Sequence, residues 1–522
     1  METLNTLKDD VVALIPARSG SIRIKNKNIK CINGVPLIGI AVIQALLLKN
    51  VGKVYVSTDS EKYAEVARNF GADIPFLRPI EIAGENTTDL EVFQHFVNWL
   101  QETRRNVPEI IVQIRATSPL RNINEVEKCV EFIKNNKKFD SLRTISIPHQ
   151  SPYKMWSFMN ESLRVVSLMR CENDEYDKST QSLPKVYAQD GVVDVIRTST
   201  IQELNSMSGK TIAGWITQEQ SWDIDTPRDF LKVSGLINTN NLLLLSSNPK
   251  TLGKNLGIIQ GRLTSSQELQ CFPNFTWRQE FDLARKAGYT CIELIRDQNY
   301  NPYNPLWNKK EIEDLLDCEN CSGVGIRSVC DDYVQNCNWE QLTIVEYNTL
   351  IDLLLSCSKL GVRLVVYPLM GNAGITDMKT KKAFIVTLKG IAALAKSLGI
   401  TILVEANLNK KELLNILKEI DMDNVRCCLD IGNLYANKCN YHEYIEDQEM
   451  LSYIGHVHIK DRNLAGENVV LGTGEINYME VLRALIKSSY CGSLICETNR
   501  GSDPLLTAVN NISYLKECIG NI

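Results

Sequence analysis

The sequence lacks both an excess of basic charge and any long hydrophobic run. Its 522 residues include 57 Lys and Arg against 62 Asp and Glu, which gives a net charge of -5. Nonspecific binding to nucleic acid depends on a positive excess, so we expect no nucleic acid among the partners. The apolar stretches, such as residues 242–245, fall short of the ~20 residues that a membrane helix needs, and we expect no membrane span.

The first residues also lack the order of a secretory signal. Lys8, Asp9 and Asp10 precede the first apolar run, whereas a signal peptide has basic residues followed by an apolar segment. We therefore expect a cytoplasmic protein, in which the 16 cysteines are mostly buried thiols. The C-x-x-C pair Cys318 and Cys321 is only a weak indication of zinc, because such a site needs four ligands at suitable spacing.

Two halves of different pattern are joined by a stretch rich in Asn, Ser and turn formers. We expect a first domain over residues 1–236, a linker over 237–254 and a second domain over 255–522. In the first half, the β-like runs VVALIP, VYVST and IIVQIRA alternate with helical patterns over 36–49 and 62–70. This alternation predicts a Rossmann-like α/β domain with a mostly parallel sheet.

The second half alternates more regularly. Candidate strands begin near residues 256, 290, 324, 363, 401, 425, 454 and 493, and helical patterns fill the gaps between them. Eight strands that alternate with helices over this length are typical of a closed (β/α)8 TIM barrel.

A loop of small residues follows the first predicted strand. It contains Ala17, Arg18, Ser19, Gly20 and Ser21, and the basic residues Arg23, Lys25 and Lys27 follow, with Asn28. Backbone N–H groups in such a loop can face phosphate oxygens while nearby cations neutralise charge, which favours a nucleoside triphosphate site. It is not a Walker loop, because no Gly-Lys-Ser/Thr closes it, and a merely solvated basic loop is the alternative.

Six motifs in the first half occur in an order that one family shares. They are IPARSGS at 15–21 with Lys27-Asn28, STDS at 57–60, Arg78-Pro79 with Ile82-Ala83, RATSPL at 115–120, SPYK at 151–154 and Asp-Ile-Asp at 223–225. Residues 10–235 thereby resemble the acylneuraminate cytidylyltransferases, the CMP-sialic acid synthetases, which have a nucleotidyltransferase fold. The resemblance implies attack by the anomeric hydroxyl of a 2-keto sugar acid on the α-phosphate of CTP, with release of pyrophosphate.

The resemblance also implies roles for individual residues. The nucleotide would be bound by Ala17, Arg18, Ser19, Gly20, Ser21, Lys27, Asn28 and Arg78, among which Arg18 and Lys27 would hold the triphosphate as catalytic cations. Arg115 and Lys154 would contact the sugar acid. Asp223 and Asp225 would bind Mg²⁺, which suits one or two carboxylates with water. Alternation on a strand end puts both on one face, although two solvated carboxylates are the alternative.

The chain departs from that family pattern at three places. Gly20-Ser21-Ile22 stands where the family usually has Gly-Ser-Lys, Arg115-Ala116 where many members have Gln-Pro, and Asp190-Gly191 where Asn-Gly is usual. The last two places lie near the acceptor sugar, so a legionaminic, pseudaminic or octulosonic acid is as good a candidate as sialic acid. The change at Ile22 leaves a transferase that uses another nucleotide on a sugar phosphate as an alternative.

Ligand-type side chains end four successive predicted strands of the second half. They are Glu405, Asp430, His458 and Glu497. Active sites of such barrels lie at the carboxyl ends of the strands, where side chains converge, so this set predicts a metal site. His456 and His458 share one strand at a spacing of two, and both therefore point to the same side.

The motif GIIQGRL at 257–263 and the Gly-Thr-Gly at 472–474 resemble those of the xylose-isomerase-like sugar phosphate isomerases and epimerases, over about residues 255–520. The resemblance implies that His458 is the ligand, with His456 packed behind it. The ion, Mn²⁺, Co²⁺ or Mg²⁺, would chelate adjacent oxygens of a keto sugar or sugar phosphate and stabilise the enediolate, while Glu405 and Glu497 exchange the proton as acid and base. A mixed carboxylate and histidine shell suits such an ion.

Taken together, these patterns favour a bifunctional enzyme of surface-sugar biosynthesis, which we expect to be a homo-oligomer. One alternative is a single active transferase whose barrel is a sugar-binding or scaffolding module. An endonuclease with three zinc ions would need several more histidines at other strand ends, and the second and third barrel strands offer Glu293 and Asp331 instead.

Overall fold

The computed structural model describes residues 10–148, 150–158, 165–169, 171, 173–217, 222–237, 255–265, 268–488, 490 and 492–522. Its residues group into two units. The first comprises Met1–Pro16, Leu48–Ser57 and Gly84–Val233, and the second comprises Ala17–Leu47, Thr58–Ala83 and Ser234–Ile522. The domain boundaries expected from the sequence stay a prediction, and all of the expected linker 237–254 except residue 237 lies outside the described residues.

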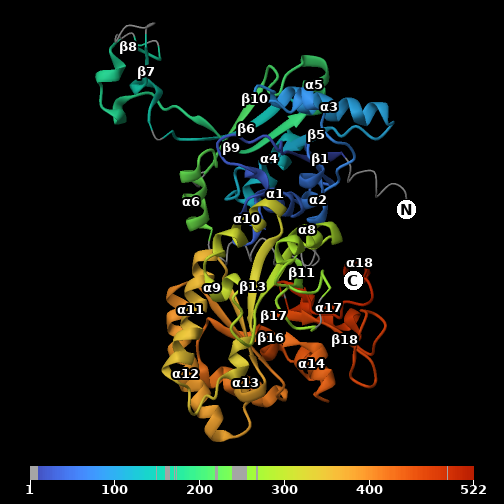
Figure 1. Ribbon diagram of the computed structural model, residues 1–522. Helices are drawn as coiled ribbons and strands as arrows, with labels where there is room; N and C mark the ends of the chain where they lie inside the picture. The colour runs from blue at the N-terminus through green and yellow to red at the C-terminus, as the bar shows by residue number, and fades with distance from the viewer. Residues whose placement is uncertain are drawn as a thin grey trace. The chain divides into compact units, whose positions relative to one another are not determined.

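A six-stranded sheet forms the centre of the first unit, in the order β10-β6-β9-β5-β1-β4 (Figure 1). Its strands are β1 (Val11–Pro16), β4 (Lys53–Ser57), β5 (Ile110–Gln113), β6 (Ser141–Ser146), β9 (Ala188–Arg197) and β10 (Ile212–Ile216). Only β9 runs antiparallel to its neighbours, β5 and β6. The mostly parallel sheet that the sequence predicts is thereby confirmed.

Three parallel strands of this sheet end side by side. β1 is flanked by β4 and β5, both parallel to it, so the carboxyl ends of these three strands lie side by side. β1 reads as a continuous apolar run because a parallel strand is buried on both faces. Other elements of this unit include α3 (Asp89–Glu102), α4 (Ile123–Asn135), α5 (Thr198–Leu204) and a hairpin of β7 (Trp156–Phe158) and β8 (Val165–Ser167).

The second unit also contains segments that follow these strand ends. They include η2 (Lys27–Ile29), the short hairpin of β2 (Cys31–Ile32) and β3 (Val35–Pro36), α1 (Leu37–Leu46) and α2 (Glu61–Asn69). The helical patterns over 36–49 and 62–70 predicted α1 and α2 to within three residues at each end. A further helix, α6 (Pro227–Leu236), runs across the boundary between the two units.

Eight parallel strands close into a barrel in the second unit. They are β11 (Leu256–Ile259), β12 (Cys291–Arg296), β13 (Gly325–Asp331), β14 (Leu364–Leu369), β15 (Thr401–Ala406), β16 (Val425–Asp430), β17 (Ile454–Ile459) and β20 (Leu494–Cys496). Each strand begins within one residue of the position predicted from the sequence, and the (β/α)8 barrel is confirmed.

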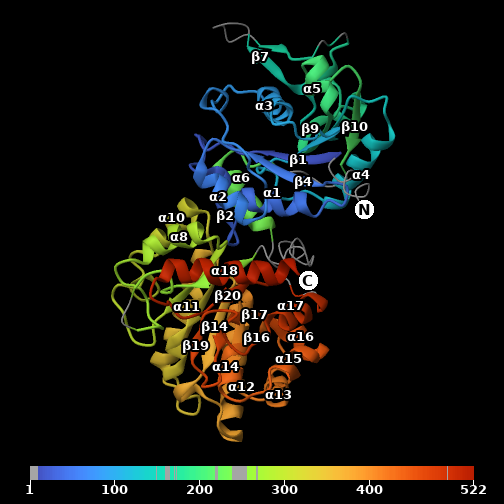
Figure 2. The same cartoon turned by 90° about the vertical axis from the view of Figure 1, so that its right-hand side faces the viewer.

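Helices cover the outside of the barrel, with α18 lying across the front in Figure 2. The longer ones are α8 (Trp277–Ala287), α10 (Ile312–Ser322), α11 (Ile344–Leu360), α12 (Met378–Ser397), α13 (Lys410–Ile420), α17 (Tyr478–Lys487) and α18 (Pro504–Gly520). Short helices α9 (Pro305–Asn308), α14 (Ile431–Ala436), α15 (His442–Glu446) and α16 (Gln448–Tyr453) stand in the loops. In the part of the chain that the structure describes, no helix combines the length and hydropathy needed to cross a bilayer.

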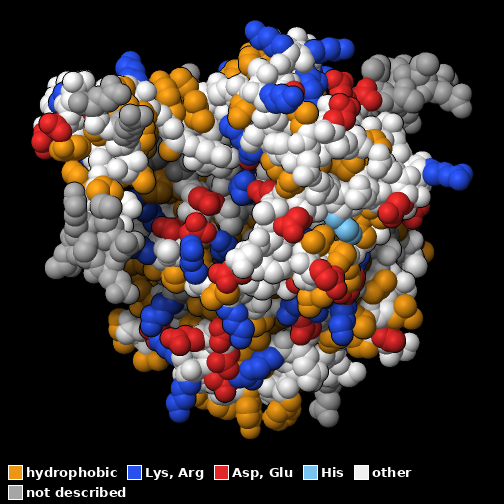
Figure 3. Space-filling model, turned by 90° about the horizontal axis from the view of Figure 1, so that it is seen from above, with side chains coloured by type: hydrophobic (Ala, Val, Ile, Leu, Met, Phe, Trp, Pro, Cys, Tyr) orange, Lys and Arg blue, Asp and Glu red, His pale blue; other side chains and the backbone are white. Residues whose placement is uncertain are grey.

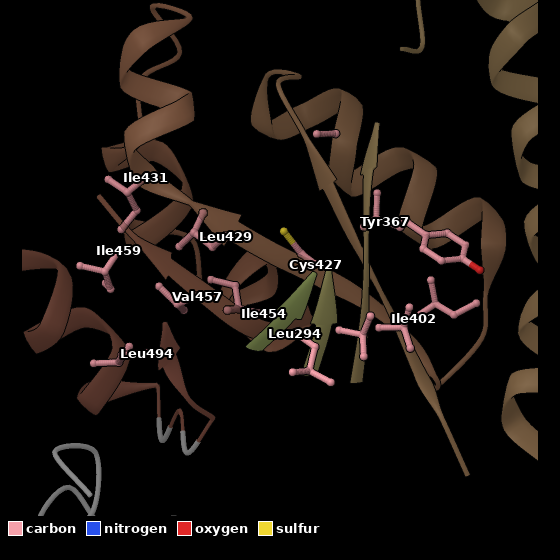
Figure 4. Packing of buried hydrophobic residues seen from close by; sticks show 14 of the residues in the cluster. Leu294, Tyr367, Ile402, Cys427, Leu429, Ile431, Ile454, Val457, Ile459 and Leu494 are labelled. Atoms are coloured by element: carbon pink, nitrogen blue, oxygen red, sulfur yellow. The ribbon is translucent and has the colours of Figure 1, made fainter. Parts of the chain in front are cut away.

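Side chains alternate between the two sides of the barrel wall. Cys427, Leu429 and Val457 pack outward in the large hydrophobic cluster (Figure 4). The interior holds a smaller buried layer that consists of Ile259, Cys291, Ile295, Cys330, Val366, Leu403, Cys428 and Ile495. Because side chains on one face of a strand recur every two residues, the residues two positions after Leu403, Cys428 and Ile495 face the same interior. The fold therefore directs Glu405, Asp430 and Glu497 into the barrel.

Surface charge is mixed rather than of one sign. On the face that Figure 3 shows, Lys and Arg side chains are interspersed with Asp and Glu side chains. This distribution agrees with the near balance of charge in the sequence, which gave no support for a nucleic-acid partner.

Candidate functional site

His458 lies at the centre of the barrel mouth. Its Nδ1 atom is 3.0 Å from Glu497 Oε2, 3.6 Å from Glu405 Oε2 and 3.8 Å from Asp430 Oδ2. The four side chains come from the ends of four neighbouring strands, β15, β16, β17 and β20, and each is at most 13% exposed. The structure therefore brings together the four residues that the sequence predicts as barrel ligands.

Asp430, His458 and Glu497 are close enough to one another to share one divalent ion, and Glu405 joins this group through its contact with His458 Nδ1. Donor atoms bound at about 2.1 Å lie about 3.0 Å apart in an octahedron and about 3.4 Å apart in a tetrahedron, close to the distances observed here. Neither ring nitrogen of His458 has hydrogen-bond alignment with a neighbour. Buried polar atoms without an aligned partner are costly unless a ligand satisfies them, so these residues fit a divalent ion.

Two buried cations face the same carboxylates. Lys460 Nζ lies 2.7 Å from Asp430 Oδ2 and 3.0 Å from Glu497 Oε1, and Arg262 Nη2 lies 3.8 Å from Glu497 Oε1. Burial disfavours the charge of Lys460, but Asp430 and Glu497 outweigh burial and raise the pKa of the ammonium. Sequence reasoning missed Lys460, although the alternation that pairs His456 with His458 places Lys460 on the same side of β17.

The carboxyl groups of the mouth experience opposing electrostatic effects. Burial raises the pKa of Glu405 to about 8, with Asp430 and Glu497 adding to the rise and His458 opposing it. Burial also disfavours the charged form of Glu497, but Lys460 and His458 outweigh it and hold the pKa of Glu497 well below its usual range. Clustered carboxylates in a buried site ionise together only when positive charge is added, which a divalent ion would supply.

Behind the mouth, Glu293 of β12 contacts both histidines of β17. Glu293 Oε2 lies 2.8 Å from His456 Nε2, and Glu293 Oε1 lies 2.9 Å from His458 Nε2. Ser328 Oγ donates to Glu293 Oε2 at 2.6 Å. All of these side chains are fully buried. The sequence offered no direct signal for this cluster, because its members lie on three strands that are distant in the chain.

In the first half of the chain, the loop after β1 is anchored at two points. Ser19 donates from its backbone N and its Oγ to the Asp59 carboxylate, at 2.8 and 2.6 Å. Asn28 Nδ2 donates to the Arg18 carbonyl at 3.0 Å. An added Cβ at Gly20 would meet no atom within 4 Å, so space is open at this turn. A loop held at its ends with open space at its turn suits a bound anion.

The other predicted nucleotide ligands lie on the same unit as this loop. Ala17 is buried directly after β1, Ser21 N donates to the Ser19 carbonyl at 2.9 Å, and Lys27 begins the short helix η2. Arg78 is 5% exposed, and its backbone N donates to the Thr58 carbonyl at 2.7 Å.

Asp223 and Asp225 lie in the first unit and are both exposed, with buried Ile224 between them. Ile224 N donates to the Thr117 carbonyl at 2.9 Å, and Ser118 Oγ donates to Asp223 Oδ1 at 3.2 Å. The alternation of the two carboxylates holds, but the expected strand end is wrong, because residues 222–225 have no strand partner. An isolated extended segment is held here by the RATSPL motif instead.

The predicted sugar contacts Arg115 and Lys154 make internal bonds. Arg115 Nη2 lies 2.9 Å from Asp89 Oδ2 and 3.3 Å from Asp194 Oδ2. Lys154 Nζ donates to the backbone carbonyls of Tyr176 and Lys178, both at 2.7 Å. Each side chain would have to exchange some of these bonds in order to contact a sugar acid.

Two known families match separate stretches of the chain. The cytidylyltransferase family matches residues 12–207. The family described as xylose isomerase-like TIM barrel matches residues 281–518.

Individual relatives are similar to one half each. The chain is 29% identical over 241 residues to the CMP-N,N'-diacetyllegionaminic acid synthase of Campylobacter jejuni, which covers 45% of this chain and 97% of that protein. It is 30% identical over 181 residues to a pseudaminic acid cytidylyltransferase of Campylobacter jejuni, which covers 34% of this chain and 75% of that protein. A structure of D-psicose 3-epimerase with D-tagatose from Clostridium cellulolyticum covers 51% of this chain and 98% of that chain, at 19% identity and a TM-score of 0.41.

Proposed function

Because the chain belongs to the cytidylyltransferase family in its first half and carries a xylose isomerase-like TIM barrel in its second, we propose that it is a bifunctional enzyme of surface-sugar biosynthesis. The first half transfers CMP from CTP to a nonulosonic acid and releases pyrophosphate. The barrel is a metal-dependent isomerase or epimerase of a keto sugar or its phosphate. The homo-oligomer expected from the sequence stays a prediction.

The transferase proposal rests on the family match together with the anchored loop at residues 17–28. Arg18 and Lys27 neutralise the triphosphate, and the backbone around Gly20 faces its oxygens. Asp223 and Asp225 hold a Mg²⁺ ion through exposed carboxylates, which leaves room for the waters that this ion retains. When bound, Mg²⁺ supplies positive charge to the reacting phosphates.

The acceptor is a nine-carbon 2-keto sugar acid of the legionaminic or pseudaminic type. The two Campylobacter relatives are named for these acids. A carboxylate on the substrate would pair with the guanidinium of Arg115, which already binds two carboxylates, Asp89 and Asp194.

A panel of nucleotides and acceptors tests this proposal. Pyrophosphate release is measured with CTP, GTP, UTP and ATP against keto sugar acids and sugar 1-phosphates. We expect release only with CTP and a nonulosonic or octulosonic acid. Turnover with GTP or UTP and a sugar 1-phosphate would instead establish the alternative transferase that Ile22 leaves open.

The barrel proposal rests on one observation, the convergence of Glu405, Asp430 and Glu497 on His458 Nδ1. These four residues would hold a divalent ion such as Mn²⁺, Co²⁺ or Mg²⁺, which would supply polarisation of the carbonyl of a bound sugar. Glu405 and Glu497 then exchange a proton on the carbon next to that carbonyl, since each lies at the mouth where the sugar enters. Lys460 and Arg262 orient Glu497 through their contacts with it.

Exchange with solvent tests the barrel. The full chain is incubated with Mn²⁺ and a panel of ketoses and ketose phosphates in D₂O, and mass spectrometry reads the label. Because carboxyl protons are labile, deuterium should enter the substrate of the native chain and should not enter with Glu497→Gln. Glu475→Gln, which alters an exposed carboxylate of a nearby loop, serves as the control and should retain exchange. Bound metal without label from any sugar would favour the sugar-binding or scaffolding module.

We also propose that residues 1–236 and 255–522 fold separately. The six-stranded sheet lies between Val11 and Ile216, and the barrel lies between Leu256 and Cys496, so neither needs strands from the other. Each half is expressed alone and unfolded with urea. An insoluble half, or one without a cooperative transition, would show that the boundary is wrong.

A further inference from the structure

Glu293 is a buried carboxylate that the proposed reaction does not use. It stands at an inward position of β12, between Cys291 and Ile295 of the interior layer, and is 0% exposed. Its two oxygens contact only donors among the described residues, namely Ser328 Oγ, His456 Nε2 and His458 Nε2. A buried carboxylate is costly unless its partners compensate its charge. We therefore expect Glu293 to have a function in the barrel.

The contact between Glu293 and His458 decides which nitrogen of the imidazole carries the proton. His458 Nε2 lies 2.9 Å from Glu293 Oε1. This contact is not aligned as a hydrogen bond, but the negative charge of the carboxylate at that distance favours a nitrogen that carries a proton over one that carries a lone pair. In a neutral imidazole one nitrogen is a donor and the other an acceptor, so the lone pair of His458 is on Nδ1.

Nδ1 is the nitrogen that faces the ligand set. It is 3.0 Å from Glu497 Oε2, with Glu405 and Asp430 within 3.8 Å. His456 and Ser328 hold the second oxygen of Glu293 and so fix the carboxylate in place. An imidazole that binds a metal through one nitrogen commonly donates the other N–H to a carboxylate, which orients the ring and raises its basicity.

We propose that Glu293 is a positioning residue that holds the proton of His458 on Nε2 and thereby selects Nδ1 as the atom that binds the divalent ion. The inference rests on the proposed ion site. His456 is part of the support for Glu293 rather than a ligand.

The competing arrangement is a second ion between Glu293, His456 and His458, whose donor atoms are close enough to share one. The distances favour a hydrogen-bonded cluster instead. The contact between His456 Nε2 and Glu293 Oε2 is 2.8 Å with hydrogen-bond alignment, and no ion fits between atoms joined in this way. The barrel should therefore bind one ion and not two.

The test is a titration with Mn²⁺ in the full chain, in which the free ion is read by electron paramagnetic resonance. Every protein carries Asp225→Asn, so that the first half contributes no site. We expect one ion in the parent chain and a 10- to 100-fold weaker affinity with Glu293→Gln, because the amide can donate to His458 Nε2 and move the proton to Nδ1.

The matched control is Asp331→Asn. Asp331 is also a fully buried carboxylate of a barrel strand, but it pairs with Arg296 at 2.6 Å and does not touch His458. Thermal unfolding without metal compares the stability of the two variants. Equal losses of stability with a loss of affinity only in Glu293→Gln support the proposal, and an affinity of Glu293→Gln within twofold of the parent overturns it.

A second measurement needs no variant of the barrel. Selective ¹⁵N-histidine labelling of the same chain loaded with Zn²⁺ shows which nitrogen of His458 is protonated and which binds the ion. An ion on Nε2, or two ions in each barrel, would overturn the proposal. A parent chain that binds no ion at all would instead refute the proposed function of the barrel.

Discussion

The two candidate sites of this chain differ in how far the protein itself completes them. In the barrel mouth, the four predicted ligands are at most 13% exposed and two buried cations contact them. In the first half, Asp223 and Asp225 are exposed, and the turn at Gly20 borders open space. The groups proposed for the barrel site already contact one another without a ligand, whereas Asp223, Asp225 and Gly20, proposed for the nucleotide, lie exposed or beside open space.

The difference follows from the cost of charge in different surroundings. Exposed carboxylates keep much of their water, so Asp223 and Asp225 need no buried cation to compensate their charge. Carboxylates clustered inside a barrel destabilise it unless cations compensate them, so Glu405, Asp430 and Glu497 require Lys460 or an ion. Changes of charge should therefore affect folding in the barrel and affect only turnover in the first half.

The largest effect should come from Lys460→Met. Removal of one partner from a buried ion pair typically costs 3–5 kcal/mol, roughly, because the carboxylates stay buried without compensation. We expect that loss in urea unfolding with a chelator present. Because Mn²⁺ can replace the missing charge, it should raise the unfolding midpoint more in the variant than in the native chain.

Lys418→Met is the matched control for that experiment. Lys418 also pairs with a glutamate, Glu449, but both side chains are about half exposed, and such pairs contribute about 0–1 kcal/mol. Equal stability losses in the two variants, or equal responses to Mn²⁺ in Lys460→Met and the native chain, would contradict the contrast between buried and exposed sites.

Asp225→Asn should show the opposite behaviour in the first half. Loss of a carboxylate that holds Mg²⁺ should reduce pyrophosphate release on the order of a hundredfold or more, because electrostatic stabilisation of the reacting phosphates is lost. Stability and the metal content of the barrel should not change, since Asp225 is exposed. Glu203→Gln alters another exposed carboxylate of the same unit and should retain turnover. Near-normal turnover of Asp225→Asn at saturating Mg²⁺ would refute the assignment.

Much of the barrel could be predicted from the sequence because its strands are short apolar runs between helical patterns. The inward side chains then followed from a period of two, which is why Glu405 and Asp430 were recognised with His458. Glu293 was noted only as a carboxylate of the second strand. Its contact with His456 was not predicted, since the two lie 163 residues apart and only closure of the barrel brings them together. Such a contact has no local signature.

The structure of the first half was harder to predict from the sequence, for a different reason. The motif Asp223-Ile224-Asp225 has the alternation of a strand, yet hydrogen bonds with Thr117 and Ser118 hold it rather than a ladder. An alternating pattern predicts that the central side chain is buried and that its two neighbours are exposed. The pattern does not predict which other part of the chain binds the segment.

A buried carboxylate outside the barrel mouth should make the stability of the chain depend on pH, which tests the cost of burying charge in a second place. Glu319 of α10 accepts a hydrogen bond from Ile326 N at 2.7 Å, and burial raises its pKa from 4.5 to about 7. The folded chain therefore binds this proton more tightly than the unfolded chain. The stabilisation is fully present below pH 4.5 and is lost as the pH rises to about 7, by up to about 3 kcal/mol.

Glu319→Gln tests this dependence in urea unfolding with a chelator present. The amide oxygen can still accept from Ile326 N, but the side chain no longer titrates. The difference in free energy of unfolding between variant and native chain should thus increase in favour of the variant from pH 4.5 to 8. A difference independent of pH would show that Glu319 ionises in the folded chain as readily as in the unfolded one.

The smallest effect should come from the helical scaffold, which gives a baseline for substitutions in the mouth. Thr343 Oγ1 accepts from Glu346 N at 3.2 Å, and the Glu346 carboxylate accepts from Thr343 N at 2.7 Å, which caps the first turn of α11. Thr343→Ala should lower the free energy of unfolding by about 1 kcal/mol, because an orphan N–H loses its partner. Thr349→Ala makes the same chemical change inside α11, where alanine is the better helix former, and should be neutral or slightly stabilising. Neither variant should alter the affinity for Mn²⁺, since α11 packs outside the barrel wall. A change of affinity in Thr343→Ala would mean that small losses of scaffold stability reach the mouth, and the affinity loss in Glu293→Gln would then no longer identify a positioning role.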